Sequence, residues 1–354
     1  MEVKELERQD ILEKSYYENL ELFKNLCLKL NEKKQYYNTI ILNHELYRFL
    51  YPTEPFLNFT HQKPASAIVE LIKKLCRLAS EMLTALQGYP HSHYEDIAKK
   101  ENCLEQRTSN LYTSLWHGYT DDVIINESQK FILYRLGNEI IEKQVKGKKV
   151  LDLGCGSGRN SLALSSLGAA KVIGMDYHRQ SYQRSQEIAK NQRMNIEFRE
   201  GNALALPFED KEFDFVYSNG VLHHTQDWKG AIDEYFRVMK TSGFIYLYAT
   251  GGFFWTTRKV MRQIFLEIPQ RYCLEVLHNI GMPSHRMIFM DVWFVPIEDH
   301  LSKAELETIF SQKVSFFKKL VSRNPIDLDK ALMDYPEEGT MVWGEGEHRY
   351  FVQR

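Results

Sequence analysis

The sequence predicts an α/β fold built on a seven-stranded, mostly parallel sheet with an antiparallel last strand. Three observations support this expectation. Short apolar runs alternate with helical patterns from residue 148 to residue 250, as in parallel strands joined by crossover helices. A glycine-rich turn follows the first of these runs. Two later strand-like runs near the end of the chain would add a hairpin that contains the antiparallel strand.

The predicted strands are short runs rich in Val, Ile, Phe and Tyr, residue types that favour extended backbone. They are Val150–Leu153, Val172–Met175, Ile196–Phe198, Phe213–Tyr217, Phe244–Tyr248, Val314–Phe317 and Arg349–Val352. Helices are expected between them, the first of which starts directly behind the glycine turn. Another helix should precede the first strand, with Asp121 and Asp122 at its start and Gly147 after its end at Val145.

The first 109 residues predict a helical segment that is separate from the sheet. Residues 1–50 carry charged and apolar residues at helical spacing, and a second helix should begin at Pro64 and end before Gly88. Residues 89–109 are polar and indicate a linker. The segment 1–109 could act as a lid, as part of the substrate pocket, or as the surface of a homodimer.

Residues 110–354 should form the second domain, with a helical insertion at about 251–312 after the fifth strand. The insertion is rich in Phe, Trp and Met, which suits a cavity for an apolar substrate and suits the core of a helical subdomain equally well. Within it, Ser302 and Glu305 have the spacing of a capping box at the start of a helix.

Composition and charge narrow the class of protein. The net charge is −2 and the lysine pairs are scattered, which argues against a large nucleic-acid interface. The five cysteines are far apart and never spaced as Cys-x-x-Cys, so neither a disulfide framework nor a zinc site is expected. No apolar run approaches the roughly 18–20 residues of a membrane span. We therefore expect a soluble cytoplasmic protein without a metal.

The clearest motif is the glycine loop after the first strand, with the order Asp152-Leu-Gly154-Cys155-Gly156-Ser-Gly158. Glycines at the carboxyl edge of a parallel sheet permit a sharp turn and let a ligand approach the backbone. Position 159 is Arg, so the Gly-x-Gly-x-x-Gly frame of dinucleotide-binding proteins fails. A carboxylate two residues before the first glycine suits a cationic ligand such as S-adenosylmethionine (SAM) better than a pyrophosphate.

Asp176 ends the second predicted strand, 18 residues after Gly158. At this position an acidic side chain can accept hydrogen bonds from both hydroxyls of a ribose. Taken alone, Asp176 could equally be a surface turn residue. Its combination with the glycine loop favours a nucleoside ligand.

A third segment carries a resemblance to a known family. It runs Glu200-Gly-Asn202-Ala-Leu-Ala-Leu-Pro207-Phe208, then Phe213-Asp-Phe-Val, then Val221-Leu-His-His224. With the loop and Asp176, these motifs resemble the class I SAM-dependent methyltransferases, particularly the group around the ubiquinone and menaquinone C-methyltransferases. The resemblance is clear from about 148 to 250 and implies a Rossmann-like sheet, SAM as cofactor and S-adenosyl-L-homocysteine (SAH) as its product.

The resemblance also implies roles for individual residues. The three loop glycines would hold the methionine part of SAM, and Asp152 would order the loop. Asp176 would hold the ribose, and Cys155 and Tyr177 would belong to the same site. Asn202 and Ala203 would meet the adenine, and Asn219 would lie near the sulfonium. The family usually has Asp at position 202, and an amide oxygen there accepts a hydrogen bond without charge assistance.

His223 and His224 are the candidate catalytic residues, because they follow the fourth strand at the edge where the methyl group should lie. One of them could act as a general base, if the acceptor must lose a proton. The alternative is that both only close the turn. Aromatic residues upstream and in the insertion could cover the site or simply pack against the sheet. They are Tyr112, Trp116, His117, Tyr119, Phe254 and Trp255.

These observations favour an enzyme that transfers a methyl group from SAM to a small molecule at C, N or O. Two alternatives stay open. One is an RNA (tRNA base) methyltransferase, since some enzymes of that kind share the Leu-His-His pattern. The other is a non-catalytic SAM-fold protein that binds a partner through its N-terminal helices.

Overall fold

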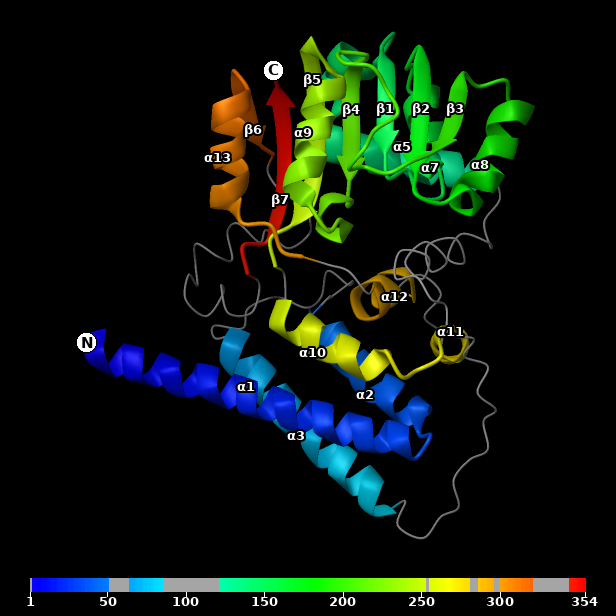
Figure 1. The fold of residues 1–354 in the computed structure, drawn as a ribbon. Helices are drawn as coiled ribbons and strands as arrows, with labels where there is room; N and C mark the ends of the chain where they lie inside the picture. The colour runs from blue at the N-terminus through cyan, green and yellow to red at the C-terminus, as the bar shows by residue number, and fades with distance from the viewer. Residues whose placement is uncertain are drawn as a thin grey trace. The chain divides into compact units, whose positions relative to one another are not determined.

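The computed structural model describes residues 2–50, 64–85, 121–252, 255–280, 286–295, 299–320 and 344–354. The chain divides into two compact units. One unit comprises Met1–Glu101, Phe253–Val295 and Pro325–Gly344, and the other comprises Asn102–Gly252, Pro296–Asn324 and Glu345–Arg354. Their helices and strands are labelled in Figure 1.

The first unit is helical and draws on two distant stretches of the sequence. Its helices are α1 (Glu2–Glu32), α2 (Tyr36–Leu50), α3 (Pro64–Ala85), α10 (Trp255–Phe265), α11 (Gln270–Asn279) and α12 (Arg286–Phe294). Helix α1 packs against both α3 and α10. Asn31 donates to the carbonyl of Ile264 at 3.0 Å, and Tyr16 is hydrogen-bonded to Thr257. The first part of the insertion, which the sequence grouped with the sheet, therefore packs with the N-terminal helices.

The second unit contains a seven-stranded sheet in the order β3-β2-β1-β4-β5-β7-β6. Its strands are β1 (Lys149–Leu153), β2 (Lys171–Asp176), β3 (Ile196–Glu200), β4 (Phe213–Asn219), β5 (Met239–Thr250), β6 (Phe316–Lys319) and β7 (Glu347–Gln353). Strand β7 is antiparallel to both of its neighbours, whereas the pairs among β1 to β5 are parallel. The predicted fold class, including the antiparallel last strand, is confirmed.

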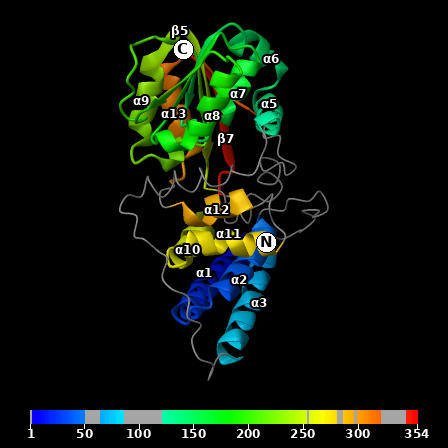
Figure 2. The same cartoon turned by 90° about the vertical axis from the view of Figure 1, so that its right-hand side faces the viewer.

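Helices cover the two faces of this sheet (Figure 2). Helices α5 (Asp121–Leu136), α7 (Arg159–Ser166) and α8 (Arg179–Asn191) lie on one face, and α9 (Trp228–Val238) and α13 (Lys303–Lys313) on the other. The predicted helix 121–145 is interrupted at Gly137, whose φ is 80°. It resumes as α6 (Asn138–Ile140) and the π-helical turn η1 (Ile141–Val145).

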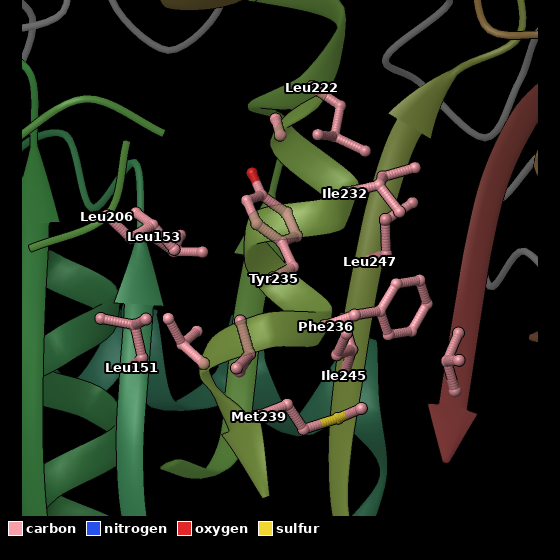
Figure 3. Close-up of a cluster of buried hydrophobic side chains, with 14 of the residues drawn as sticks. Leu151, Leu153, Leu206, Leu222, Ile232, Tyr235, Phe236, Met239, Ile245 and Leu247 are labelled. Carbon is pink, nitrogen blue, oxygen red and sulfur yellow. The ribbon is translucent and has the colours of Figure 1, made fainter. Parts of the chain in front are cut away.

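The core between the sheet and α9 is mostly apolar. Side chains from β1, β5 and α9, among them Leu151, Leu247 and Phe236, lie against one another there (Figure 3). Nearly all of these side chains are apolar and closely packed. Their burial is the main source of stability for this layer.

One local prediction is wrong. Ser302 occupies the N-cap position of α13, but its side chain makes no capping hydrogen bond. The N–H of Lys303 instead donates to Glu345, and Glu305 pairs with Lys229 at 2.8 Å. Tertiary partners have replaced the local capping box. Among the described residues, no helix is long and apolar enough to cross a membrane.

Candidate active site

The glycine loop connects β1 to α7, and its three glycines differ in their surroundings. All have positive φ, 60° at Gly154, 53° at Gly156 and 76° at Gly158. A Cβ on Gly154 would lie 2.4 Å from Val221, and one on Gly158 would lie 2.7 Å from Phe198. A Cβ on Gly156 would meet no atom of the described residues within 4 Å. Gly156 is therefore where the loop backbone is open to a ligand.

Asp176, at the end of β2, lies directly beside that open position. One carboxylate oxygen accepts from the N–H of Gly156 at 2.8 Å, and the other accepts from the N–H of His178 at 3.3 Å. The N–H of Cys155 donates to the carbonyl of Met175 at 3.0 Å and so ties the loop to β2. Burial raises the pKa of Asp176, although the hydrogen bonds that it accepts from the two N–H groups oppose this shift. The structure thus brings the predicted ribose carboxylate to the centre of the glycine loop.

Asp152 lies beneath the loop and is 1% exposed. Its carboxylate accepts a hydrogen bond from the Ser161 hydroxyl at 2.6 Å, which joins β1 to the first turn of α7. Burial raises the pKa of Asp152 from 3.8 to about 7, more than the Ser161 bond lowers it. The Cys155 thiol is also buried, and burial raises its pKa well above the usual value. If Cys155 contacts the cofactor as predicted, its backbone and not its thiol would make the contact.

The other predicted cofactor residues differ in how they are engaged. Asn219 ends β4, and its side-chain oxygen is buried without a hydrogen-bond partner among the described residues. Asn202 is exposed, and its side-chain oxygen accepts from the N–H of Leu204 at 2.9 Å, which holds its own turn. Ala203 beside it is half-buried, and Tyr177 is 47% exposed. The buried oxygen of Asn219 is the one that most needs a ligand.

His223 and His224 form the short 3₁₀ turn η2 (Leu222–His224) after β4. Nδ1 of the buried His223 accepts from the N–H of Thr250 at 3.4 Å, and the carbonyl of His223 accepts from the N–H of Asp299 at 2.7 Å. The His223 ring contacts the ring of His224, with 4.2 Å between their centroids. His223 is thus built into the turn, whereas His224 is half-buried. The catalytic role of His223 and His224 stays a prediction.

Most of the predicted lid lies outside the described residues, namely Tyr112, Trp116, His117, Tyr119 and Phe254. Trp255 is the first residue of α10 in the helical unit, where it is half-buried. The role of these aromatic residues in covering the site stays a prediction. No group of His, Cys, Asp and Glu side chains suitable for a metal occurs in the described ranges.

Sequence reasoning missed several residues that build the loop. Ser161 holds Asp152, and the Ser185 hydroxyl donates to the carbonyl of Ser157 at 2.5 Å. Val221 closes over Gly154. Two of these are small polar residues on helices that follow the strands, and such residues draw attention only when the acidic side chain or carbonyl they face is known.

The assembled groups fit SAM. The loop backbone is open at Gly156. Beside it, the carboxylate of Asp176 and the side-chain oxygen of Asn219, which has no partner among the described residues, offer acceptors for ribose hydroxyls and for positive charge. A pyrophosphate would instead be repelled by Asp176 at this place. These residues lie at the carboxyl edge of three neighbouring strands, where ligands of open α/β sheets bind.

Known proteins match the same part of the chain. Residues 151–247 match the methyltransferase domain family. The chain is 34% identical over 142 residues to a demethylmenaquinone methyltransferase of Lactococcus lactis, which is 39% of this chain and 56% of that one. It is 29% identical over 127 residues to an O-methyltransferase of Aspergillus nomiae, which is 35% of this chain and 56% of that one.

The aligned regions span about half the length of these relatives, so the likeness concerns the sheet domain. The match begins within β1 and ends within β5, and it contains the glycine loop, Asp176 and the turn with the two histidines. Residues 151–247 therefore carry a methyltransferase domain of the class I SAM-dependent family, and SAM is the cofactor that this family implies.

Proposed function

We propose that this protein transfers the methyl group of SAM to a small-molecule acceptor at C, N or O. The observation that carries the proposal is the contact of Asp176 with the N–H of Gly156, at the one loop glycine whose side is open. The relatives named above methylate, by their names, a menaquinone precursor or an oxygen atom. They support a small-molecule acceptor as a class and leave the acceptor atom open.

Positioning would be the main contribution of the protein. SAM supplies a methyl group on a good leaving group, so the chain has to bind, orient and exclude water. Asp176 and the loop backbone would fix the nucleoside end, and Asn219 would direct the other end toward β5. These contacts would leave the methyl group beside the histidine turn.

The two histidines would then have different tasks. Because Nδ1 of neutral His223 accepts from Thr250, its proton lies on Nε2, and this side chain can donate but not accept at Nε2. We therefore assign the role of general base, where the acceptor needs one, to His224. His224→Gln should lower kcat, whereas His223→Gln should mainly reduce stability.

Calorimetric titration with SAH tests the cofactor site. Asp176→Ala should weaken SAH binding at least about tenfold, because a charge-assisted hydrogen bond contributes about 1.5–3 kcal/mol. Asp233→Ala is the matched control, since Asp233 is an exposed carboxylate that pairs with Lys313 at 2.7 Å on the α9 side of the sheet. A folded wild-type protein that does not bind SAH would overturn the proposal. If SAH binds, isotope-labelled SAM with pooled small-molecule acceptors then tests methyl transfer.

A further inference from the structure

Three arginines lie on the α5 side of the sheet, and the cofactor site described above uses none of them. They are Arg135 of α5, Arg159 at the start of α7 and Arg349 of β7. The Arg349 residue is 3% exposed and the Arg135 side chain 13% exposed. The guanidinium carbon of Arg135 lies 4.6 Å from the centre of the Tyr248 ring, and that of Arg349 lies 5.8 Å from it. Two buried cations thus share one aromatic ring.

Their negative partner is Glu347, and it does not satisfy both. Arg349 donates to Glu347 through Nη2, and the hydroxyl of Tyr248 donates to the same carboxylate at 3.4 Å. Nη1 of Arg135 is 3.8 Å from Glu347, which is beyond hydrogen-bond distance. Nε and Nη1 of Arg135 and Nε of Arg349 have no hydrogen-bond partner among the described residues. Buried N–H groups on cations are costly to leave unpaired.

The strand register places this arginine pair beside the cofactor site. Asn219 of β4 pairs with Tyr248 of β5, and Tyr248 pairs with Arg349 of β7. These residues form one row along the carboxyl edge of the sheet. Asp176 lies on β2, on the opposite side of β1 from this row. A ligand group at Arg349 would therefore lie across β1, β4 and β5 from a ribose held at Asp176.

We propose that Arg135 and Arg349 bind a carboxylate on the methyl acceptor, so that the acceptor class is an organic acid. This inference rests on the proposed methyl transfer. Guanidinium groups match carboxylates through paired N–H donors, and burial strengthens the attraction. Glu347 competes for the same N–H groups and partly neutralises the pair before the acceptor arrives. The ring of Tyr248 supports both guanidinium groups through cation–π contact.

The test compares acids with their amides on the full chain saturated with SAH. Acetate and benzoate should each bind at least about tenfold more tightly than acetamide and benzamide, as expected when a charge-assisted pair is added. Arg349→Met and Arg135→Met should abolish this preference. Arg184→Met is the matched control, because Arg184 is an arginine of α8 that pairs with Asp121 at 3.0 Å. An equal affinity of the wild-type protein for acids and amides would overturn the inference.

A second variant keeps the test decisive if the arginine variants fail to fold. Glu347→Gln removes the competing charge and keeps a similar volume, so it should tighten acetate and benzoate binding while leaving the amides unchanged. Weaker binding of the acids in this variant would contradict the proposal.

SAH itself carries a carboxylate, so its binding needs a separate arm. SAH and 5′-methylthioadenosine, which lacks the amino-acid part, should both bind Arg349→Met as they bind the wild type. If only SAH is weakened, the arginines hold the cofactor, and the assignment to the acceptor is wrong. In either case SAH binding by the wild type shows that the proposed cofactor site survives a failure of this inference, and methyl transfer from isotope-labelled SAM tests the proposed function separately.

Discussion

The two faces of the sheet have different chemistry. On the α9 face, the buried residues from β1, β4 and β5 are mostly apolar, and Leu247 and Ile245 pack directly against the helix (Figure 3). The buried polar Ser218 on this face is hydrogen-bonded to Tyr235 of α9 at 3.2 Å. On the α5 face, the same strands place Asp152, Tyr217 and Tyr246 in one row, with Arg135 above them. Neighbouring residues of one strand therefore serve different purposes, because successive side chains point to opposite faces.

This difference indicates where the protein tolerates an energetic cost. Apolar burial stabilises the α9 face. On the α5 face, buried charges and the buried Tyr217 hydroxyl, which has no hydrogen-bond partner among the described residues, reduce the net stability. Such costs are typical of surfaces shaped by ligand binding. Substitutions on the two faces should therefore separate stability from binding.

The largest effect on stability is expected on the apolar face. Leu247→Ala removes a side chain that is 1% exposed and leaves a cavity beside α9. It should lower the free energy of unfolding by about 3–5 kcal/mol, while SAH affinity of the protein that remains folded stays unchanged. Urea unfolding and calorimetry measure the two quantities. A loss of SAH affinity without a loss of stability would show that the two faces are not separable in this way.

A gain in stability is expected at Asp152. Its folded-state pKa of about 7 lies above the ordinary value of 3.8, so the charged form is disfavoured in the folded protein. This cost is present above pH 7 and disappears as the pH falls from about 7 to about 4. Asp152→Asn should therefore stabilise the ligand-free protein at pH 8 by about 2–4 kcal/mol, since one pKa unit corresponds to about 1.4 kcal/mol.

The comparison of pH 8 with pH 5 checks the cause of this gain. At pH 5 the wild-type carboxyl is mostly protonated, so the variant and the wild type should differ much less in thermal unfolding. An equal gain at both pH values would mean that ionisation of Asp152 is not responsible. SAH affinity of the variant should fall at pH 8, because the negative charge beneath the loop that would hold the cationic end of the ligand is lost.

The sequence predicted the sheet well because both of its signals are local. Alternation of apolar runs with helices marked all seven strands, and the spacing of Asp152, the glycines and Asp176 marked the loop. The sequence did not reveal the arginine pair, since Arg135 and Arg349 belong to no motif and are brought together only by their shared tertiary contacts with Tyr248 and Glu347. For the same reason it grouped the whole insertion with the sheet, although α10 packs against α1.

Local helix signals were reliable only where no tertiary contact competed with them. Asp227, for which no cap was predicted, caps α9 by accepting from the N–H of Gly230 at 2.9 Å. Ser302 has the predicted capping-box spacing, but the N–H of Lys303 donates to Glu345, more than 40 residues further along the chain. Gly137 was hidden inside an apolar helical pattern, and its positive φ breaks a helix that periodicity alone would continue.

The loop glycines offer a smaller effect that distinguishes packing from binding. Gly156→Ala should lower the free energy of unfolding by about 1–2 kcal/mol, because alanine disfavours the positive φ at this position. No steric clash adds to this cost, since a Cβ there meets no atom of the described residues within 4 Å. It should nevertheless weaken SAH binding about tenfold or more, since the methyl group would occupy the open side of the loop. Gly158→Ala is the contrasting variant, because its Cβ would collide with Phe198 and Ser185. Its main loss should be in thermal stability.

The smallest effect is expected at Tyr217, at the centre of the polar face. Its hydroxyl is buried and has no hydrogen-bond partner among the described residues, while its ring stacks on Tyr246 at 5.1 Å. Tyr217→Phe keeps the stack and removes an unpaired polar group, so stability should stay the same or rise by less than about 1 kcal/mol. Urea unfolding that shows a loss well beyond this range would mean that the hydroxyl has a partner. The polar face would then be held together by its own hydrogen bonds, and the unpaired groups near Arg135 would no longer argue for a ligand.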